Sequence, residues 1–265
     1  MTDWPDVIVR TQGPVAEVRL NRPGARNAFS QALMRQLIEV AAHFRASTEV
    51  QAVIVTGAET YFSAGADLVD PERTANSTAT RLQRRQAARL GPDLCAAWES
   101  LEQVTIAAIE GYCIGGAAAL AVSLDFRIAG QGSYLRLPEI ALGMNMSWGA
   151  LPRITALVGP ARAKRFAIFC EPCAADEALA WGMVDEVTAA GEALATAHTW
   201  AAKVAGLPPL PVRMTKEAIT AASTTLNRAA AAMDRDQWLL TSGTNDFAEG
   251  GAAFREKRKP AFKGD

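Results

Sequence analysis

Short apolar segments with strand-like patterns alternate with helical patterns along the first half of the chain, and this alternation constrains the fold most strongly. The helical patterns begin at Ser30, at about Ala79, where the pattern runs to Glu102, and after Gly116. The strand-like segments are residues 7–9, 15–20, 52–55, 105–109 and 126–129. Strands that alternate with helices form parallel sheets through βαβ crossovers. The sequence therefore predicts an α/β fold.

The second half of the chain is expected to be mostly helical. Residues 161–169 and 174–181 have helical patterns, Gly182 is a plausible helix stop, and residues 184–187 form one more short strand. Residues 207–211 read Leu-Pro-Pro-Leu-Pro, and three prolines in four positions cannot lie inside a helix. We therefore predict a core of residues 1–206 and a helical domain of residues 207–265. This domain is too small to bury its own apolar face, so it is expected to pack on the core or on another subunit.

Composition and charge limit the kinds of ligand. The chain has 27 Lys and Arg against 28 Asp and Glu, which does not favour nucleic acid as a partner. No leader pattern and no membrane-spanning run of about 18 apolar residues occurs, so a cytoplasmic protein without a membrane contact is expected. The two histidines, His43 and His198, lie in helical patterns, which disfavours histidine-based triads and metal sites. A small molecule is the expected ligand, and no metal site is predicted.

Two glycine-rich segments have the character of ligand-binding loops. Residues 61–68 read Tyr-Phe-Ser-Ala-Gly-Ala-Asp-Leu, and residues 109–119 read Ile-Glu-Gly-Tyr-Cys-Ile-Gly-Gly-Ala-Ala-Ala. Small residues let a ligand approach the backbone, and the start of a helix leaves N–H groups unpaired. Together the segments can offer two N–H groups to one oxygen, as stabilising a thioester enolate requires. Taken singly, each segment is a weak signal, because a glycine pair at a helix start more often reflects ordinary turns or close packing than an anion site.

The order of these and further motifs resembles the crotonase superfamily, also called the enoyl-CoA hydratase/isomerase family. The matching segments are residues 20–23 with 27–28, 62–67, 111–116, 124–125, 138–140 with 143, 153–159, 181–184 and 254–260. The resemblance covers nearly the whole chain. It implies a ββα spiral core with a C-terminal helical oligomerisation domain, assembled as a homotrimer or homohexamer. It also implies an acyl-CoA thioester as substrate and no separate cofactor, because coenzyme A is part of the substrate.

The resemblance also implies roles for individual residues. The backbone N–H groups of Ala66 and Gly116 correspond to an oxyanion hole, and Glu139 corresponds to a catalytic glutamate. Asp67 is expected mainly to hold its loop through hydrogen bonds, and Arg26 and Lys257 are candidates for contacts to coenzyme A, although a charged run near the C-terminus is by default a solvated face. The predicted substrate-binding residues are Arg26, Ala64, Asp67, Gly115, Ala119, Asn145, Ser147, Trp148 and Lys257.

The chain departs from the hydratase pattern at one catalytic position. Hydratases of this superfamily use a second glutamate, and the position that corresponds to it is Ala119. Loss of a positioned acid or base typically costs about 10²–10⁴-fold in rate. An isomerase or hydratase-lyase with Glu139 as single general acid/base is therefore favoured. The alternatives are a hydratase with an unusual water-positioning group and a catalytically silent acyl-CoA-binding protein.

The loop after Gly143 is also unusual, with the sequence Met-Asn-Met-Ser-Trp-Gly-Ala. Asn145 and Ser147 are candidates to orient a substrate or a water molecule, and Trp148 is a candidate wall of the acyl pocket. Alternatively, Ser147 caps a helix that begins near Trp148. The segment 70–86 is expected to shape the same pocket.

Overall fold

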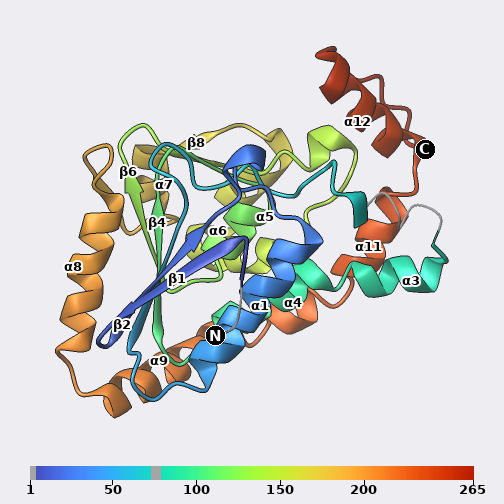
Figure 1. The fold of residues 1–265 in the computed structure, drawn as a ribbon. Coiled ribbons are helices and arrows are strands. Elements are labelled where there is room, and N and C mark those ends of the chain that lie inside the picture. Colours follow the sequence, from blue (N-terminus) through green and yellow to red (C-terminus); the bar gives the residue numbers. More distant parts are fainter. Residues whose placement is uncertain (1–3, 73–78) are drawn as a thin grey trace.

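The computed structural model describes residues 4–72 and 79–265 (Figure 1). Its main sheet has six strands in the order β1-β2-β3-β4-β6-β9. β1 and β2 form an antiparallel hairpin, and the remaining neighbours pair in parallel. The strands are β1 (Val7–Gln12), β2 (Val15–Leu20), β3 (Ala52–Thr56), β4 (Val104–Ile109), β6 (Phe126–Gly130) and β9 (Glu186–Thr188). The predicted α/β class and the predicted strands are confirmed.

A second, smaller sheet was not indicated by the sequence patterns. It contains β5 (Tyr112–Ile114), β7 (Tyr134–Arg136) and β8 (Cys173–Ala174). These strands are two or three residues long, too short for apolar alternation to reveal them. Through β5, this sheet holds the second glycine-rich segment just before the helix that begins at Gly116.

The core helices cover both faces of the main sheet. α1 (Gln31–Arg45) begins after Ser30, whose Oγ accepts a hydrogen bond from the Leu33 N–H at 3.1 Å, as predicted. α8 (Ala193–Ala205) packs on the opposite face over β3, β4 and β6. The other core helices are α3 (Arg81–Ala87), α4 (Leu90–Glu99), α5 (Gly116–Ala121), α6 (Ala150–Phe169) and α7 (Ala175–Trp181).

Two helix predictions need correction. The segment 79–102 contains two helices, α3 and α4, instead of one. Pro92 explains the break, because it has no N–H to donate to the Ala88 carbonyl and its ring would clash with that group. The helix predicted over residues 161–169 is the second half of α6, which begins at Ala150 and bends at Gly159, where φ is 78° and ψ is 164°.

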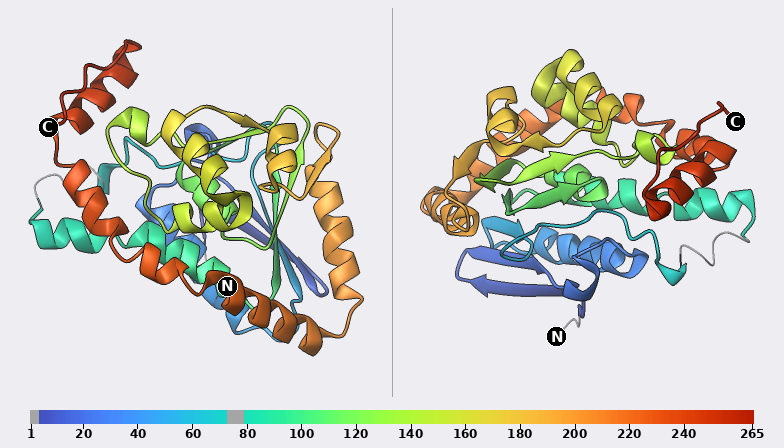
Figure 2. Two further views of the ribbon diagram at one scale, coloured as in Figure 1. Left: turned by 180° about the vertical axis from the view of Figure 1, so that it is seen from behind. Right: turned by 90° about the horizontal axis from the view of Figure 1, so that it is seen from above.

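The C-terminal helices are α9 (Pro209–Thr224), α10 (Asn227–Ala230), α11 (Asp234–Thr241) and α12 (Asn245–Glu256). The prolines of residues 208–211 lie at the start of α9, where a missing N–H costs no helical hydrogen bond. Lys216 anchors α9 to the core through an ion pair of 2.6 Å with Asp125. α12 and α8 lie at opposite ends of the molecule (Figure 2). The division into domains at 206/207 and the trimeric or hexameric assembly stay predictions.

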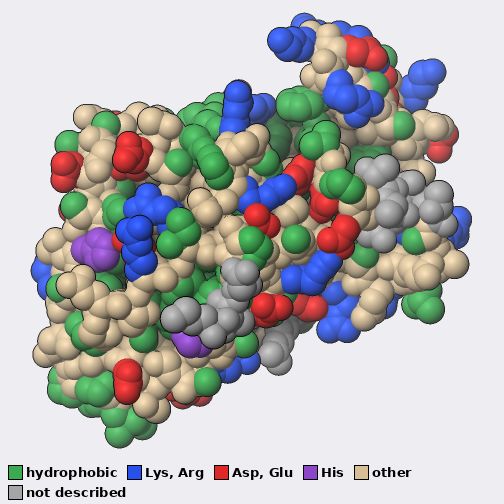
Figure 3. Space-filling view, viewed as in Figure 1, with side chains coloured by type: hydrophobic (Ala, Val, Ile, Leu, Met, Phe, Trp, Pro, Cys, Tyr) green, Lys and Arg blue, Asp and Glu red, His purple; other side chains and the backbone are tan. Residues whose placement is uncertain are grey.

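Charges of both signs are interspersed on the face shown in Figure 3, which fits the near-zero net charge. Within residues 4–72 and 79–265, no helix combines the length and apolar character required to cross a bilayer.

Candidate active site

A cavity of about 320 Å³ brings together segments that are far apart in the sequence. Its walls come from α1, the loop 66–70, α3 and α4, the start of α5, the segment 139–148, and the region of α11 and α12. The predicted site residues that line it are Ala66, Asp67, Gly116, Glu139, Asn145, Ser147 and Trp148. All three residues predicted to be catalytic therefore share one cavity.

The loops that carry Ala66 and Gly116 are fixed side by side by backbone hydrogen bonds. Phe62 and Ser63 both donate to the Tyr112 carbonyl at 3.1 Å, and Ile114 donates back to Ser63 at 3.2 Å. Gly65 has φ of 86°, and a Cβ on it would lie 2.5 Å from the Ile114 carbonyl oxygen. Only glycine accommodates both the positive φ and this close approach.

The amides of Ala66 and Gly116 are free. Ala66 lies opposite Phe29 in a parallel β-bridge. The two hydrogen bonds of this bridge run from the Phe29 N–H to the Gly65 carbonyl and from the Asp67 N–H to the Phe29 carbonyl, so they do not use the Ala66 N–H. Gly116 is the first residue of α5 and so has no preceding turn to which it could donate. Among the described residues, neither N–H group donates a hydrogen bond. Both residues line the cavity, so two unused donors are available to a ligand there.

Glu139 places its carboxyl group beside Gly115, in the cavity that Ala66 and Gly116 also line. Its backbone carbonyl accepts from Leu142 and Met144, at the entrance to a short 3-10 helix, Ile140–Leu142. A Cβ on Gly115 would lie 2.7 Å from Glu139 Oε1, so the carboxyl group packs directly on that glycine. Oε2 is buried and has no hydrogen-bond partner among the described residues.

Burial also changes the acidity of Glu139. Desolvation raises the pKa of its carboxyl from 4.5 to about 7, and a hydrogen bond from its own backbone and the positive charge of Arg136 only partly oppose this shift. A group with a pKa near neutrality can both accept and donate a proton under ordinary conditions. The acidity of the Glu139 carboxyl therefore suits proton transfer.

The other carboxylates that line the cavity are already engaged in loop structure. Asp67 pairs with Arg22 at 3.0 Å and accepts from the Val69 N–H, so the prediction that it holds its loop is confirmed. Asp70 accepts from the N–H groups of Gln31 and Glu72.

Ala119, at the position of the second hydratase glutamate, is fully buried inside α5 and does not line the cavity. Its methyl group supplies no acid or base.

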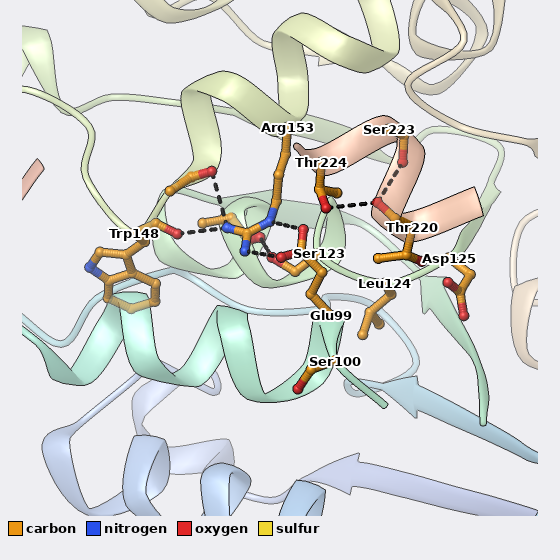
Figure 4. A network of polar contacts seen from close by, with 12 residues as sticks. Glu99, Ser100, Ser123, Leu124, Asp125, Trp148, Arg153, Thr220, Ser223 and Thr224 are labelled. Atoms are coloured by element: carbon orange, nitrogen blue, oxygen red, sulfur yellow. Dashed lines mark hydrogen bonds and ion pairs between the residues drawn. The ribbon is translucent and has the colours of Figure 1, made fainter. Parts of the chain in front are cut away.

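The loop 144–149 is anchored from two sides, by Arg153 (Figure 4) and by Asp234. Arg153 donates from Nη1 to the carbonyls of Trp148 and Gly149, both at 3.0 Å, and its guanidinium forms a two-point contact with Glu99 at 2.6 and 2.8 Å. Asp234, from α11, accepts from the Gly149 N–H at 2.8 Å. These contacts hold Trp148 at φ of 70°, a region that residues other than glycine rarely adopt.

The interpretation of Ser147 as a helix cap is wrong. α6 begins at Ala150, its N-cap residue is Gly149, and no side chain caps it. Ser147 instead lines the cavity.

Asn145 lines the cavity as well, and its Oδ1 accepts from Thr241 of α11 at 2.9 Å. Its Nδ2 is buried and has no partner among the described residues, so it is a further unused donor beside the two backbone amides.

Several predicted substrate contacts lie outside the cavity lining. Arg26 is beside Tyr112, Lys257 ends α12 at the surface, and Ala64 lies on the loop before Ala66. Gly115 is next to Glu139 but does not line the cavity. Their contacts to substrate or coenzyme A stay predictions.

Part of the cavity wall was not indicated by the sequence patterns. These residues are Phe29, Gln31, Met34, Ala87, Ala88, Leu90, Gly91, Met144, Met146, Trp238, Ser242 and Phe247. Of the segment expected to shape the pocket, Asp70 and Arg84 line the cavity, whereas residues 73–78 lie outside the described residues. Among these lining residues, only Gly91 belongs to a local sequence signal, the Gly91-Pro92 pair. That pair indicates the start of a helix and does not indicate a binding site.

Comparison with known proteins decides the family. The family model described as "Enoyl-CoA hydratase/isomerase" matches residues 10–265. The chain belongs to the enoyl-CoA hydratase/isomerase family. The resemblance to the crotonase superfamily is thereby confirmed.

Individual relatives of this family match over almost the whole chain. A 2,3-dehydroadipyl-CoA hydratase of Escherichia coli (strain K12) is 32% identical over 98% of this chain and 99% of its own length. A short-chain-enoyl-CoA hydratase of Clostridium acetobutylicum is 33% identical over 96% of each chain. The crystal structure of an enoyl-CoA hydratase from Mycobacterium avium subsp. paratuberculosis K-10 superposes with a TM-score of 0.87 at 26% identity, covering 97% of this chain and 98% of that one. The crotonase-like fold of this family member is thus established.

Proposed function

We propose that this protein is an acyl-CoA-processing enzyme in which the Ala66 and Gly116 amides stabilise a thioester enolate and Glu139 is the single general acid/base. The observation that carries the proposal is the unpartnered Oε2 of Glu139 in the same cavity as two free backbone amides. Membership of the enoyl-CoA hydratase/isomerase family supports an acyl-CoA substrate. Coenzyme A arrives as part of that substrate, so the proposed reaction uses no other cofactor.

The favoured reaction is proton transfer between carbons of the acyl chain. The thioester carbonyl oxygen accepts hydrogen bonds from the two amides, and the Glu139 carboxylate removes a proton from C2 of a 3-enoyl group. The negative charge moves onto the carbonyl oxygen, where the preorganised N–H groups stabilise it. The protonated Glu139 then returns the proton to C4, and the double bond shifts to C2. Deprotonation of a hydroxyl substituent by the same carboxylate would instead begin carbon–carbon cleavage, as in hydratase-lyases.

Hydration is the second candidate, and the unused Nδ2 of Asn145 favours it. Thr241 holds Asn145 through Oδ1, which leaves Nδ2 free to donate to a water molecule in the cavity. Such a donor could position water while Glu139 accepts its proton, in place of the glutamate that Ala119 lacks. The names of the Escherichia coli and Clostridium acetobutylicum relatives as hydratases also support this candidate.

Product analysis separates the candidates. The protein is incubated with trans-3-hexenoyl-CoA and, separately, with trans-2-hexenoyl-CoA, and products are identified by mass spectrometry after chromatography. Double-bond isomerisation without hydroxyacyl product supports the single-carboxylate mechanism, and rapid hydroxyacyl formation supports hydration. Each activity should fall about 10²–10⁴-fold in Glu139→Gln. Tight binding without turnover of either thioester contradicts the enzyme proposal and supports a silent acyl-CoA-binding protein.

The matched control is Glu59→Gln, which makes the same chemical change at an exposed position. It should behave as the wild type in both assays. An equal loss in both variants would show that the effect does not come from the cavity.

A further inference from the structure

The indole of Trp148 fills a slot between two glycines of different helices. A Cβ on Gly91 of α4 would lie 2.1 Å from Cε2 of the indole, and a Cβ on Gly116 of α5 would lie 2.5 Å from its Cη2. Both distances are far below van der Waals contact, so any larger residue at either position would collide with the ring. Phe29 stacks on the indole with ring centroids 6.2 Å apart and an interplanar angle of 23°. The ring therefore has close neighbours on three sides.

The backbone of Trp148 is held as tightly as its ring. The buried Arg153 binds the carbonyls of Trp148 and Gly149, and Asp234 binds the Gly149 N–H (Figure 4 shows the Arg153 contacts). Neither Arg153 nor Asp234 lines this cavity, so they bear on it through the loop that they hold. The ion pair of Arg153 with Glu99 in turn holds the guanidinium that binds these carbonyls.

The indole of Trp148 lies next to the backbone amide that is proposed to bind the thioester oxygen. Gly116 supplies one of the two amides that would bind the thioester oxygen, and the indole lies directly against the Cα of that residue. The atoms of an acyl group next to the carbonyl would therefore meet the indole first. On the far side of the indole, the backbone of α4 closes the slot at Gly91.

We propose that Trp148, seated in the notch that Gly91 leaves in α4, sets the upper size limit of the acyl group and restricts the substrates to short-chain acyl-CoA thioesters. This proposal rests on the proposed acyl-CoA function. Gly91 takes part because only a residue without a Cβ lets the indole sit back against α4. With the ring in place, the space between Gly116 and Gly91 is closed to a chain. Removal of the ring opens that space.

Binding of unreactive saturated thioesters tests the size limit without requiring turnover. The affinities of hexanoyl-CoA and decanoyl-CoA are measured by isothermal titration calorimetry for the wild type, Trp148→Ala and the control Trp181→Ala. Trp181 lies on α7, outside the cavity, against Arg162 and Arg165. The wild type and the control should bind decanoyl-CoA no more tightly than hexanoyl-CoA. Trp148→Ala should prefer decanoyl-CoA, with about a fourfold gain for each additional methylene that the opened space buries.

A double-mutant cycle tests the role of Gly91. It compares the effect of Gly91→Ala on hexanoyl-CoA binding in the wild type with its effect in Trp148→Ala. Gly91→Ala should weaken hexanoyl-CoA binding at least fivefold when Trp148 is present, because the new methyl group pushes the indole into the cavity. The same substitution in Trp148→Ala should change binding less than twofold. Equal effects of Gly91→Ala in both backgrounds would refute the shared slot.

The remaining outcomes separate this inference from the proposed function. If the wild type binds hexanoyl-CoA and Trp148→Ala keeps the wild-type preference for length, the size limit is wrong and the acyl-CoA function stands. If the wild type binds neither thioester, the acyl-CoA function is wrong and the size limit falls with it.

Discussion

Glu139 should make the folded protein less stable at neutral and alkaline pH, and the size of this effect follows from its pKa. Burial raises the pKa of this carboxyl from 4.5 to about 7, whereas in the unfolded chain it keeps its ordinary value. Between these two pH values the unfolded chain releases the proton and the folded protein retains it. The free energy of unfolding therefore falls as pH rises through this window, and the loss is complete above about pH 7.

The magnitude comes from the difference between the two pKa values. Each pH unit of difference corresponds to about 1.36 kcal/mol, so ionising Glu139 in the folded protein costs about 3 kcal/mol at pH 8. At pH 5 the cost is below about 1 kcal/mol, because the carboxyl is still protonated in the folded state. Glu139→Gln keeps the shape of the side chain and removes the charge. We therefore expect this variant to be more stable than the wild type by about 3 kcal/mol at pH 8, and by less than about 1 kcal/mol at pH 5.

Urea unfolding followed by circular dichroism, at equal protein concentration and at both pH values, measures this difference. The exposed Glu59 provides the control, since Glu59→Gln should match the wild type at pH 5 and at pH 8. A Glu139→Gln variant that is no more stable than the wild type at pH 8 would refute the argument that this carboxylate is ionised at a cost in a desolvated site. An equal gain at both pH values would show that the effect does not come from ionisation.

Three further outcomes follow from the site. The value of kcat/KM should rise about tenfold per pH unit below about pH 7 and level off above it, because the carboxylate form of Glu139 accepts the proton; a flat profile from pH 5 to 9 contradicts this role. Arg153→Met should lower the free energy of unfolding by about 3 kcal/mol, because it leaves Glu99 without its partner in a partly buried site, and a urea-measured loss under about 1 kcal/mol would contradict that. Thr241→Val should release Asn145 and, if Asn145 positions water, lower hydroxyacyl formation with little change in isomerisation; an unchanged product ratio by mass spectrometry argues against that role.

The main sheet was predictable because each of its strands is a local signal. Residues 15–20 alternate between buried and more exposed positions, and residues 52–56 are a continuous buried run bounded by turns. Ser30 likewise marks the start of α1 through a side-chain hydrogen bond that spans three residues. Such patterns depend on neighbours along the chain, so they are visible without the structure.

The cavity was less predictable because its walls depend on distant contacts. Gly91 and Trp148 are 57 positions apart in the sequence, and nothing near either residue indicates that the ring fills the space above the glycine. Thr241 binds Asn145 from the C-terminal helices, again without a local pattern. The two glycine-rich segments indicated a pair of N–H donors by themselves, but the assignment of these donors to Ala66 and Gly116 came from the family resemblance, because each loop alone is compatible with ordinary turns.

The most direct test of the central claim is deuterium incorporation into the acyl chain. The protein is incubated with trans-3-hexenoyl-CoA in deuterated water, and the label in the recovered thioesters is located by tandem mass spectrometry for the wild type, Glu139→Gln and Glu59→Gln. We predict label at C2 or C4 with the wild type and with Glu59→Gln, and loss of at least about 10²-fold in the labelling rate with Glu139→Gln. Labelling by Glu139→Gln at the wild-type rate would contradict the account, because a group other than Glu139 would then move the proton.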